Sequence, residues 1–335
     1  MNKIAVTGGG GFIGLALVKA LRKRKLQVRV LGRHRYSQAE QYGARCLVGD
    51  IRDQRFVRNC LEGVDTVFHV AAKAGIWGPW REYFGINVSG TANILAACLH
   101  NRVKRLVYTS TPSVVFGGLD LEGVDESVPY AARPLCHYQR TKILAEKLVL
   151  AANQDQLLTT AIRPHLVWGP GDTNLIPRLI TRGRTGRLRI VGQGTNRVDI
   201  SYIDNVVAAH LLLAQDLAGH GRSAGRAFFV SQGDPVALWP WINGLFHRLH
   251  MEPVNKRISL RTAWFTGLLM EAYHGLLSRQ KEPLMTRFLA EQLGRSHWFS
   301  IGRIRKLGYH PEIDTTTGMN RLVAWLTAKG KIEPA

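Results

Sequence analysis

Cysteine is scarce in this 335-residue chain, and its few thiols lie far apart. None belongs to a CxxC pair and no histidine pair lies near one, so the sequence predicts neither a disulfide framework nor a structural zinc site. We therefore expect reduced thiols, as in a cytoplasmic protein, and no bound metal. The four cysteines are Cys46, Cys60, Cys98 and Cys136.

Long apolar runs are missing as well. No stretch reaches the roughly 18 residues that a membrane-spanning helix needs. The first strand-like segment begins at Lys3, so we expect no signal peptide ahead of the fold. Because 45% of the residues are hydrophobic, the chain can still bury a large core.

Acidic residues are outnumbered: 45 lysines and arginines stand against 24 acids, a formal net charge of +21. The first 39 residues contain nine basic residues and no acid. Nucleic acid, anionic lipid, an acidic partner or phosphorylated ligands would each match this charge, as would an ordinary solvated surface. Since the sequence has no RNA-binding aromatic signature, zinc finger or helix-turn-helix spacing, we do not expect nucleic acid as a partner.

Short apolar segments typical of β-strands alternate with helical patterns through the first half of the chain. Because these segments are apolar almost throughout, they predict a parallel sheet covered on both faces, the doubly wound α/β (Rossmann) architecture. We assign 1–171 to a dinucleotide-binding Rossmann domain. We assign 172–335 to a smaller, mainly substrate-binding C-terminal lobe, with segments such as 226–231 returning to the sheet. The predicted strands of the first half are 3–7, 28–32, 45–50, 65–72, 105–110 and 158–164, with a long helix over 87–99.

The sequence TGGGGFIG joins the first predicted strand to a helix. In dinucleotide-binding folds the first glycine of such a motif permits a tight turn, the second lets the backbone approach a pyrophosphate, and the third lets the helix pack on the strand. Gly8, Gly11 and Gly14 stand at these places, whereas Gly9 and Gly10 are interpreted as merely tolerated. The helix then offers its unpaired N–H groups to the anion. The predicted phosphate contacts are Gly8, Gly11, Phe12 and Ile13.

The end of the second predicted strand indicates which dinucleotide binds. NAD-selective sites place an acid there to hold the 2′-hydroxyl of the ribose. Here the chain lacks that acid and continues with Arg33, His34 and Arg35. A guanidinium suits a 2′-phosphate, so we predict NADP(H), with Arg33 as the main contact and Arg35 as the second. The alternative is two surface arginines beside an ordinary turn. Asp50 and Ile51, after the third strand, are predicted to bracket the adenine.

A tyrosine and a lysine open the helix that we predict from about residue 138. Their i, i+4 spacing puts Tyr138 and Lys142 on one helix face. An unperturbed tyrosine has a pKa of about 10, and a neighbouring ammonium lowers the pKa, which suits acid–base catalysis near neutrality. The hydroxyl-rich segment TSTPS ends the preceding strand, at the sheet edge where doubly wound folds bind ligands. The tyrosine–lysine motif alone is common, but its combination with these hydroxyls and the glycine turn is specific.

These motifs together resemble the extended short-chain dehydrogenase/reductase family, and within it the branch related to 3β-hydroxysteroid dehydrogenases. The resemblance covers nearly the whole chain and rests on TGGGGFIG, GDIRD, the hydroxyl segment, YxxxK and RPHLVWGPGD. It implies that Tyr138 donates a proton to the forming alkoxide, that Lys142 lowers the pKa of Tyr138 and binds the nicotinamide ribose, and that Thr111 polarises the substrate carbonyl. The family usually has serine in place of Thr111, which leaves Ser110 and Ser113 as competitors.

The resemblance also implies further contacts to the cofactor and to the substrate. Lys73 is interpreted either as a partner of a substrate carboxylate or as a solvated side chain. The segment 262–277, beside Arg261 and Arg279, fits three roles: core packing, a wall for a long acyl chain, or a helix lying on a membrane surface. The further cofactor contacts are Ala71, Ala72, Lys73, Pro164 and Leu166, and the substrate contacts are Lys73, Trp77, Trp80 and Trp168.

The activity implied by the resemblance is NADPH-dependent reduction of the β-keto group of a long-chain 2-alkyl-3-oxoalkanoate, as in bacterial olefin biosynthesis. The alternative is an NAD(P)-dependent 3β-hydroxysteroid or sterol dehydrogenase, which would present the same groups to a rigid polycyclic alcohol. A nucleotide-sugar epimerase is disfavoured because the acid for the 2′-hydroxyl is missing, and a redox sensor because Tyr138 and Lys142 are both present. The expected partners are the keto acid or sterol-like substrate, and a second copy or pathway enzymes; peripheral membrane contact stays open.

Overall fold

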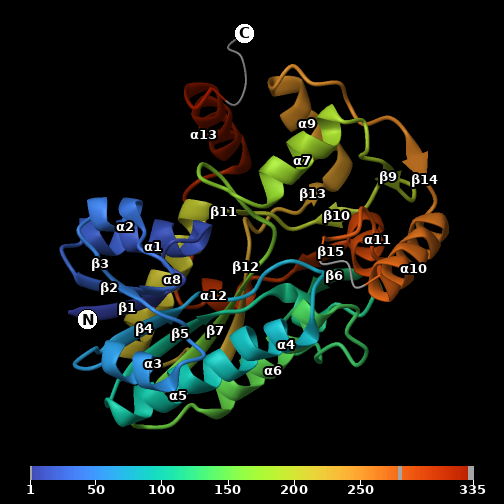
Figure 1. The fold of residues 1–335 in the computed structure, drawn as a ribbon. Helices are drawn as coiled ribbons and strands as arrows, with labels where there is room; N and C mark the ends of the chain where they lie inside the picture. Colours follow the sequence, from blue (N-terminus) through green and yellow to red (C-terminus); the bar gives the residue numbers. More distant parts are fainter. Residues whose placement is uncertain (1, 278–280, 331–335) are drawn as a thin grey trace.

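The computed structural model of the protein describes residues 2–277 and 281–330. Its centre is a sheet of seven strands in the spatial order β12-β7-β5-β4-β1-β2-β3 (Figure 1). Every neighbouring pair runs parallel, so each connection must cross over a face of the sheet. The strands are β1 (Lys3–Thr7), β2 (Gln27–Gly32), β3 (Arg45–Val48), β4 (Thr66–His69), β5 (Arg105–Thr109), β7 (Leu158–Pro164) and β12 (Arg226–Val230).

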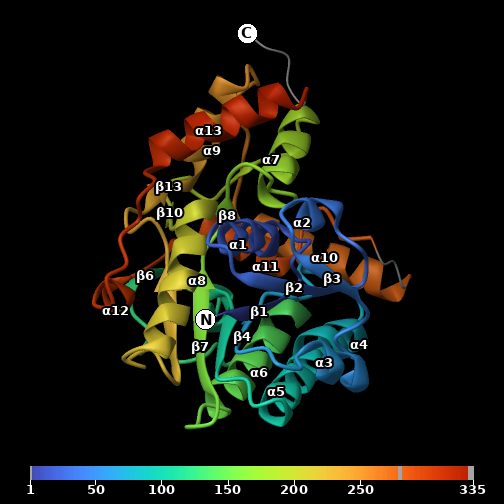
Figure 2. The same ribbon diagram turned by 90° about the vertical axis from the view of Figure 1, so that its left-hand side faces the viewer.

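Two hydrophobic cores lie on opposite faces of this sheet because side chains alternate along each strand. In β1, Ile4 and Val6 belong to one core and Ala5 to the other, and all three are buried. Helices α1 and α8 cover the first face, and α3, α5 and α6 cover the second (Figure 1 and Figure 2). The predicted doubly wound α/β fold is therefore confirmed. These helices are α1 (Phe12–Lys23), α3 (Gln54–Cys60), α5 (Gly90–His100), α6 (His137–Ala151) and α8 (Ile203–Ala218).

The strand order changes direction at β1. β2 and β3 follow on one side of β1, whereas β4, β5 and β7 follow on the other. At such a point the chain leaves the carboxyl ends of two neighbouring strands in opposite directions, and ligands of open α/β sheets bind in the crevice that results. The glycine turn after β1 and the segment after β4 border this crevice, so the topology itself selects a place for the site.

The second half of the chain builds a smaller sheet, but the two halves exchange segments. The small sheet has the order β13-β10-β15-β6, and β6 comes from the first half of the chain. In return, β12 joins the edge of the large sheet and α8 packs on one of its faces. The domain boundary after residue 171 stays a prediction. The remaining elements are α2 (Ser37–Gln41), the 3₁₀ turn η2 (Pro112–Val115), β6 (Leu121–Val124), β8 (Val167–Trp168), α7 (Leu175–Arg184), β9 (Ile190–Val191), β10 (Arg197–Val198), β11 (Ser201–Tyr202), β13 (Val236–Ala237), α9 (Leu238–Arg248), β14 (Arg257–Ile258), α10 (Leu260–Leu276), α11 (Arg287–Gly294), β15 (His297–Phe299), α12 (Gly302–Arg305) and α13 (Thr315–Ala328).

The helix predicted over 87–99 begins earlier than that range indicates. It starts as α4 (Trp80–Tyr83), passes through the π-helical turn η1 (Phe84–Ser89) and continues as α5. Trp80, Tyr83 and Phe84 already stand at the i, i+3, i+4 spacing of a helix, a signal that the range 87–99 leaves out. At Gly90 an added Cβ would come within 2.6 Å of the Ile51 side chain, so the start of α5 lies close against the segment after β3.

The segment 262–277 is helical, as α10, but it does not pack as a core helix. Only two of its residues, Ala263 and Gly267, are buried, whereas Leu269 is 70% exposed. The core-packing interpretation is therefore wrong for most of this helix. Arg279, which we expected beside it, lies outside the described residues. No helix within 2–277 or 281–330 is both long enough and apolar enough to cross a lipid bilayer.

Candidate active site

The glycine turn after β1 is built from close backbone contacts. Gly8 adopts a φ of +68°, its N–H bonds to the carbonyl of Leu31 at 3.0 Å, and an added Cβ would lie 2.8 Å from the Cα of Ala71. At Gly14 an added Cβ would lie 2.2 Å from the Gly8 carbonyl oxygen, so the helix can approach the turn only without a side chain there.

The two central glycines are also required, which corrects the expectation that they are merely tolerated. An added Cβ at Gly9 would lie 2.7 Å from Val30, and one at Gly10 only 2.0 Å from the ring of Tyr36. No local sequence pattern points to the second contact, because Tyr36 lies beyond the next strand.

A cavity of about 760 Å³ opens at the carboxyl edge of the sheet, beside this turn. It brings together chain segments that follow six strands of the large sheet, β1, β2, β3, β4, β5 and β7, as expected at the crevice of a doubly wound fold. The predicted site residues that line it are Gly8, Gly11, Phe12, Ile13, Arg33, Asp50, Ile51, Ala71, Ala72, Lys73, Thr111, Tyr138, Lys142, Pro164 and Leu166.

Cationic groups gather at the β2–β3 end of this cavity. Arg33 lines it, and so does Arg52, which holds the carboxylate of Asp50 at 2.6 Å. Hydrogen bonds from Arg52 lower the pKa of Asp50, and the charge of Arg33 adds to this. Arg52 was absent from the sequence-based assignment although it belongs to the motif GDIRD, which was a usable signal.

Arg35 does not join this group. Its guanidinium pairs with Glu40 at 2.9 Å, its side chain is 75% exposed, and it is not among the residues that line the cavity. The assignment of Arg35 as a second contact for the 2′-phosphate is therefore withdrawn. Tyr36, the next residue, lines the cavity instead, and its ring packs against Gly10 and Gly32.

The hydroxyl of Tyr138 lies inside the cavity and is hydrogen-bonded to the side chain of Thr111. Tyr138 stands in the first turn of α6, whereas Thr111 precedes the 3₁₀ turn that follows β5. Burial raises the pKa of Tyr138 to about 12, and the bond to Thr111 opposes that shift. The net shift is opposite to the one we expected from a neighbouring ammonium, because burial outweighs the other influences.

Lys142 is anchored to the sheet. Its Nζ donates to the carbonyl oxygen of Thr109 at 2.6 Å and lies 4.2 Å from the centre of the Tyr108 ring. The residue is only 1% exposed, and this burial lowers the pKa of Lys142 to about 7, while the carboxylate of Glu146 acts in the opposite direction.

Of the three competing hydroxyls, Thr111 has the most direct connection to Tyr138. Ser113 bonds to the Thr111 hydroxyl at 3.1 Å but does not line the cavity. Ser110 lines the cavity, and its buried hydroxyl has no hydrogen-bond partner within the described chain.

Two buried histidines connect to the strands beneath the site, and the sequence did not point to them. Nδ1 of His69 lies 2.7 Å from the hydroxyl of Thr7, which also accepts the N–H groups of Val70 and Ala71. His210 bonds through Nε2 to the hydroxyl of Thr109 at 2.8 Å. Burial lowers the pKa of His69 to about 3 and that of His210 to about 4, so both rings are neutral near pH 7.

The segment after β4 is held by Asn87, a residue of the π-helical turn. The side chain of Asn87 accepts the N–H of Lys73 at 2.7 Å and donates to Thr141 of α6 at 3.0 Å. Lys73 itself is ion-paired with Glu82, and its Nζ lies 5.3 Å from the centre of the Tyr83 ring. The ammonium group of Lys73 therefore already has a carboxylate partner within the protein.

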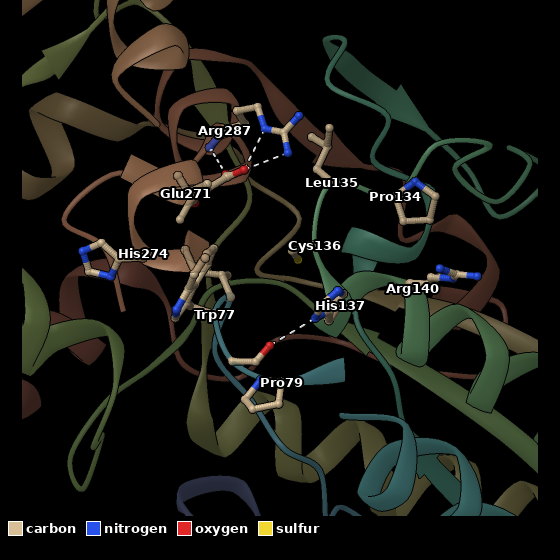
Figure 3. Close-up of a pocket in the computed structure, with 14 residues that line it drawn as sticks. Trp77, Pro79, Pro134, Leu135, Cys136, His137, Arg140, Glu271, His274 and Arg287 are labelled. Carbon is tan, nitrogen blue, oxygen red and sulfur yellow. Dashed lines mark hydrogen bonds and ion pairs between the residues drawn. The ribbon is translucent and has the colours of Figure 1, made fainter. Parts of the chain in front are cut away.

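A second cavity of about 690 Å³ lies between the 76–79 loop, the start of α6, and helices α10 and α11 (Figure 3). Trp77 projects into it toward His274, whose ring centre is 6.0 Å away, and His137 bonds to the Gly78 carbonyl at 3.1 Å. Glu271 is paired with Arg287 at 2.7 Å across its wall. His137 lines this cavity and Tyr138 lines the first, so both cavities border the start of α6.

The other two predicted tryptophans lie elsewhere. Trp80 lies beside this cavity, where Arg140 packs over its ring at 4.8 Å. Trp168 is fully buried between Tyr202 and Trp241, with ring centres 5.3 and 5.4 Å away. It lines neither cavity because Val167, its neighbour on β8, takes the cavity side and successive residues alternate. Trp168 is therefore a core residue and not a substrate contact. No group of three or more metal-binding side chains comes together in the described part of the chain.

A buried ion pair stabilises α6 one turn beyond Lys142. Glu146 and Arg163 are both buried and lie 2.5 Å apart, and Tyr130 donates to the same carboxylate at 2.9 Å. Replacing Glu146 by Gln leaves the Arg163 cation without its charged partner, so we expect the free energy of unfolding to fall by about 3 kcal/mol. Urea denaturation followed by circular dichroism measures this. The exposed Glu122→Gln serves as control, and equal midpoints for the two variants would contradict the expectation.

Comparison with known proteins finds relatives along the whole chain. The 3-beta hydroxysteroid dehydrogenase/isomerase family matches residues 5–261. A 2-alkyl-3-oxoalkanoate reductase of Stenotrophomonas maltophilia (strain K279a) is 45% identical over 96% of this chain and 98% of its own. The 2-alkyl-3-oxoalkanoate reductase of Shewanella oneidensis is 42% identical over 96% of this chain and 85% of its own. The decarboxylating sterol-4-alpha-carboxylate 3-dehydrogenase of Homo sapiens is 33% identical over 96% of this chain and 87% of its own. Among solved structures, MoeE5 in complex with UDP-glucose and NAD has a TM-score of 0.74 at 26% identity, over 98% and 99% of the chains.

Proposed function

The chain belongs to the 3-beta hydroxysteroid dehydrogenase/isomerase family and is an NAD(P)-dependent oxidoreductase, and from this premise we propose a specific reaction. The protein uses NADPH to reduce the β-keto group of a long-chain 2-alkyl-3-oxoalkanoate to the 3-hydroxy acid. The observation that carries the proposal is the place of Tyr138: it lines the first cavity with its hydroxyl bonded to Thr111, and the preceding residue, His137, lines the second.

The first cavity fits a dinucleotide. At Gly11 an added Cβ would meet no protein atom closer than 3.4 Å, so packing within the protein does not demand glycine there. Because Gly11 lines the cavity, a side chain at this position would obstruct whatever the cavity holds, which supports a close approach by the pyrophosphate. Arg33 supports NADPH over NADH because a guanidinium binds a 2′-phosphate, and β2 ends in Leu31 and Gly32 without the acid that would accept the 2′-hydroxyl.

The protein's own residues supply the proton. Bound NADPH supplies the hydride. The raised pKa keeps Tyr138 protonated near neutral pH, which is the form that can donate a proton to the oxygen of the reduced ketone. The bond to Thr111 fixes the direction of the phenol, and the Thr111 hydroxyl polarises the carbonyl. After the transfer a phenolate is left in a buried site, where the ammonium of Lys142 stabilises it and is in turn stabilised by that charge.

The second cavity supports a substrate with an alkyl chain. Its lining includes Trp77, Pro79 and Leu135, which offer apolar surface next to the catalytic tyrosine. The alternative substrate is a sterol or 3β-hydroxysteroid, supported by the 33% identity to the human sterol dehydrogenase. A homodimer, assembly with pathway enzymes and a cytoplasmic location stay predictions.

A panel assay separates the two substrates. We expect NADPH oxidation with 2-alkyl-3-oxo acids, with kcat/KM rising as the alkyl chain lengthens, because each methylene buried in the cavity adds about 0.8 kcal/mol. Ketosteroids and 3β-hydroxysteroids, assayed with NADPH and NADP respectively, are the comparison. Steroid turnover without keto acid reduction would overturn the proposal in favour of the alternative.

A further inference from the structure

Helix α10 turns large apolar side chains toward the outside of the molecule. Phe265, Leu269, Tyr273 and Leu276 follow one another at spacings of four, four and three residues, so they share one face of the helix. They are 59%, 70%, 51% and 85% exposed. We call these four residues the α10 stripe. Figure 1 shows α10 at the outer edge of the ribbon.

Small residues on the opposite face explain why α10 is oriented this way. At Gly267 an added Cβ would come within 2.5 Å of the Thr286 backbone, so α10 packs directly against the start of α11. Ala263, one turn earlier, is fully buried. The close backbone contact therefore occupies the inner face with small side chains and leaves the large ones outside.

The charges around the stripe are of one sign. In 256–277 and 281–284, the exposed charged side chains are all cations: Lys256, Arg257, Arg261 and Lys281. Arg261 lies at the first turn of α10, and Lys281 follows its other end. The one acid within α10, Glu271, faces the second cavity and is paired with Arg287, and the half-buried Glu282 beyond the helix is paired with Arg178. An apolar stripe with cations at both ends matches the surface of an anionic bilayer.

The inner side of the same helix lines the second cavity. Glu271, His274 and Gly275 border that cavity, and Figure 3 shows His274 and Glu271 on the side that faces Trp77. The helix that carries the exposed apolar stripe is therefore also a wall of the second cavity, whose lining includes both apolar and charged side chains.

We propose that the α10 stripe docks the protein peripherally on anionic lipid bilayers. The four apolar side chains enter the interface between headgroups and acyl chains, and Arg257, Arg261 and Lys281 bind the headgroups.

A second copy of the chain fits this surface less well. Two stripes packed in antiparallel order would bring Arg261 of one copy against Lys281 of the other, and parallel packing would pair like residues. Either arrangement brings cations together.

Vesicle flotation with the full chain tests the docking. The vesicles contain phosphatidylcholine with phosphatidylglycerol, or phosphatidylcholine alone. We expect the protein to float with the anionic vesicles, less so at high salt, and hardly with the neutral ones. The double variant Leu269→Ser/Leu276→Ser should bind at least about tenfold more weakly, because each leucine loses its burial in the acyl region. Leu119→Ser, at a loop leucine of 69% exposure, is the matched control and should bind like the unmodified protein.

The docking proposal is independent of the proposed reaction. Leu269 and Leu276 line neither cavity, so the double variant should keep its turnover of a short water-soluble keto acid and its thermal unfolding temperature. The proposal is overturned if the unmodified protein stays with the bottom fraction, or if the double variant floats as well as the control. A dimer that the double variant converts to monomer, with no vesicle binding, would assign the stripe to a second copy instead.

Discussion

Replacing Tyr138 by Phe is expected to lower kcat for keto acid reduction by about 10³-fold with little change in KM, because the proton donor is lost while the cavity keeps its shape. The phenol is the group that shares a hydrogen bond with Thr111 at the start of α6, which borders both cavities. Steady-state NADPH oxidation measures the effect. Tyr42→Phe, a tyrosine on the surface beside α2, is the control and should be neutral. An unchanged kcat in Tyr138→Phe would mean that Tyr138 is not the acid.

The competing hydroxyls can be separated in the same assay. Thr111→Val removes the hydroxyl bonded to Tyr138 and should lower kcat, whereas Thr111→Ser restores a hydroxyl and should recover most of it. Ser113→Ala should have a smaller effect, since the Ser113 hydroxyl contacts Thr111 and does not line the cavity. A larger loss in Ser110→Ala than in Thr111→Val would transfer the role of polarising the carbonyl to Ser110.

Replacing Arg33 by Ala is expected to raise KM for NADPH by about 10- to 100-fold, the range of a charge-assisted hydrogen bond, and to leave KM for NADH nearly unchanged. The reason is that only NADPH carries a 2′-phosphate for the guanidinium. Arg35→Ala is the matched control two residues away, and it should affect neither cofactor because Arg35 pairs with Glu40 outside the cavity. Equal weakening of both cofactors by Arg33→Ala would show that Arg33 does not distinguish them.

The sequence predicts the sheet and most of the candidate site because both depend on short-range patterns. Most strands of the large sheet are largely apolar runs, and the glycine turn and the hydroxyl segment each follow directly after such a run. The parallel arrangement then brings these segments to one edge. Gly8 and Thr111 meet at one cavity for this reason, and Tyr138 reaches the same cavity from the start of α6.

What the sequence missed depends on contacts that no local pattern encodes. The direction of Arg35 is set by Glu40 on α2, and the burial of Trp168 by Tyr202 and Trp241. The exposure of α10 follows from the backbone contact between Gly267 and Thr286. An apolar helix sequence is equally compatible with burial and with exposure, so only the packing of its neighbour decides between them.

The two neutral histidines beneath the site make the fold sensitive to acid. In an unfolded chain a histidine binds a proton with a pKa of about 6.5, whereas His69 and His210 in the folded protein do so only near 3 and 4. Between those values and 6.5 the unfolded chain therefore holds more protons than the folded one, and falling pH favours unfolding. The hydrogen bonds from His69 to Thr7 and from His210 to Thr109 nevertheless keep their form through this range. Mild acid thus lowers the population of folded molecules, while these two hydrogen bonds persist in the molecules that remain folded.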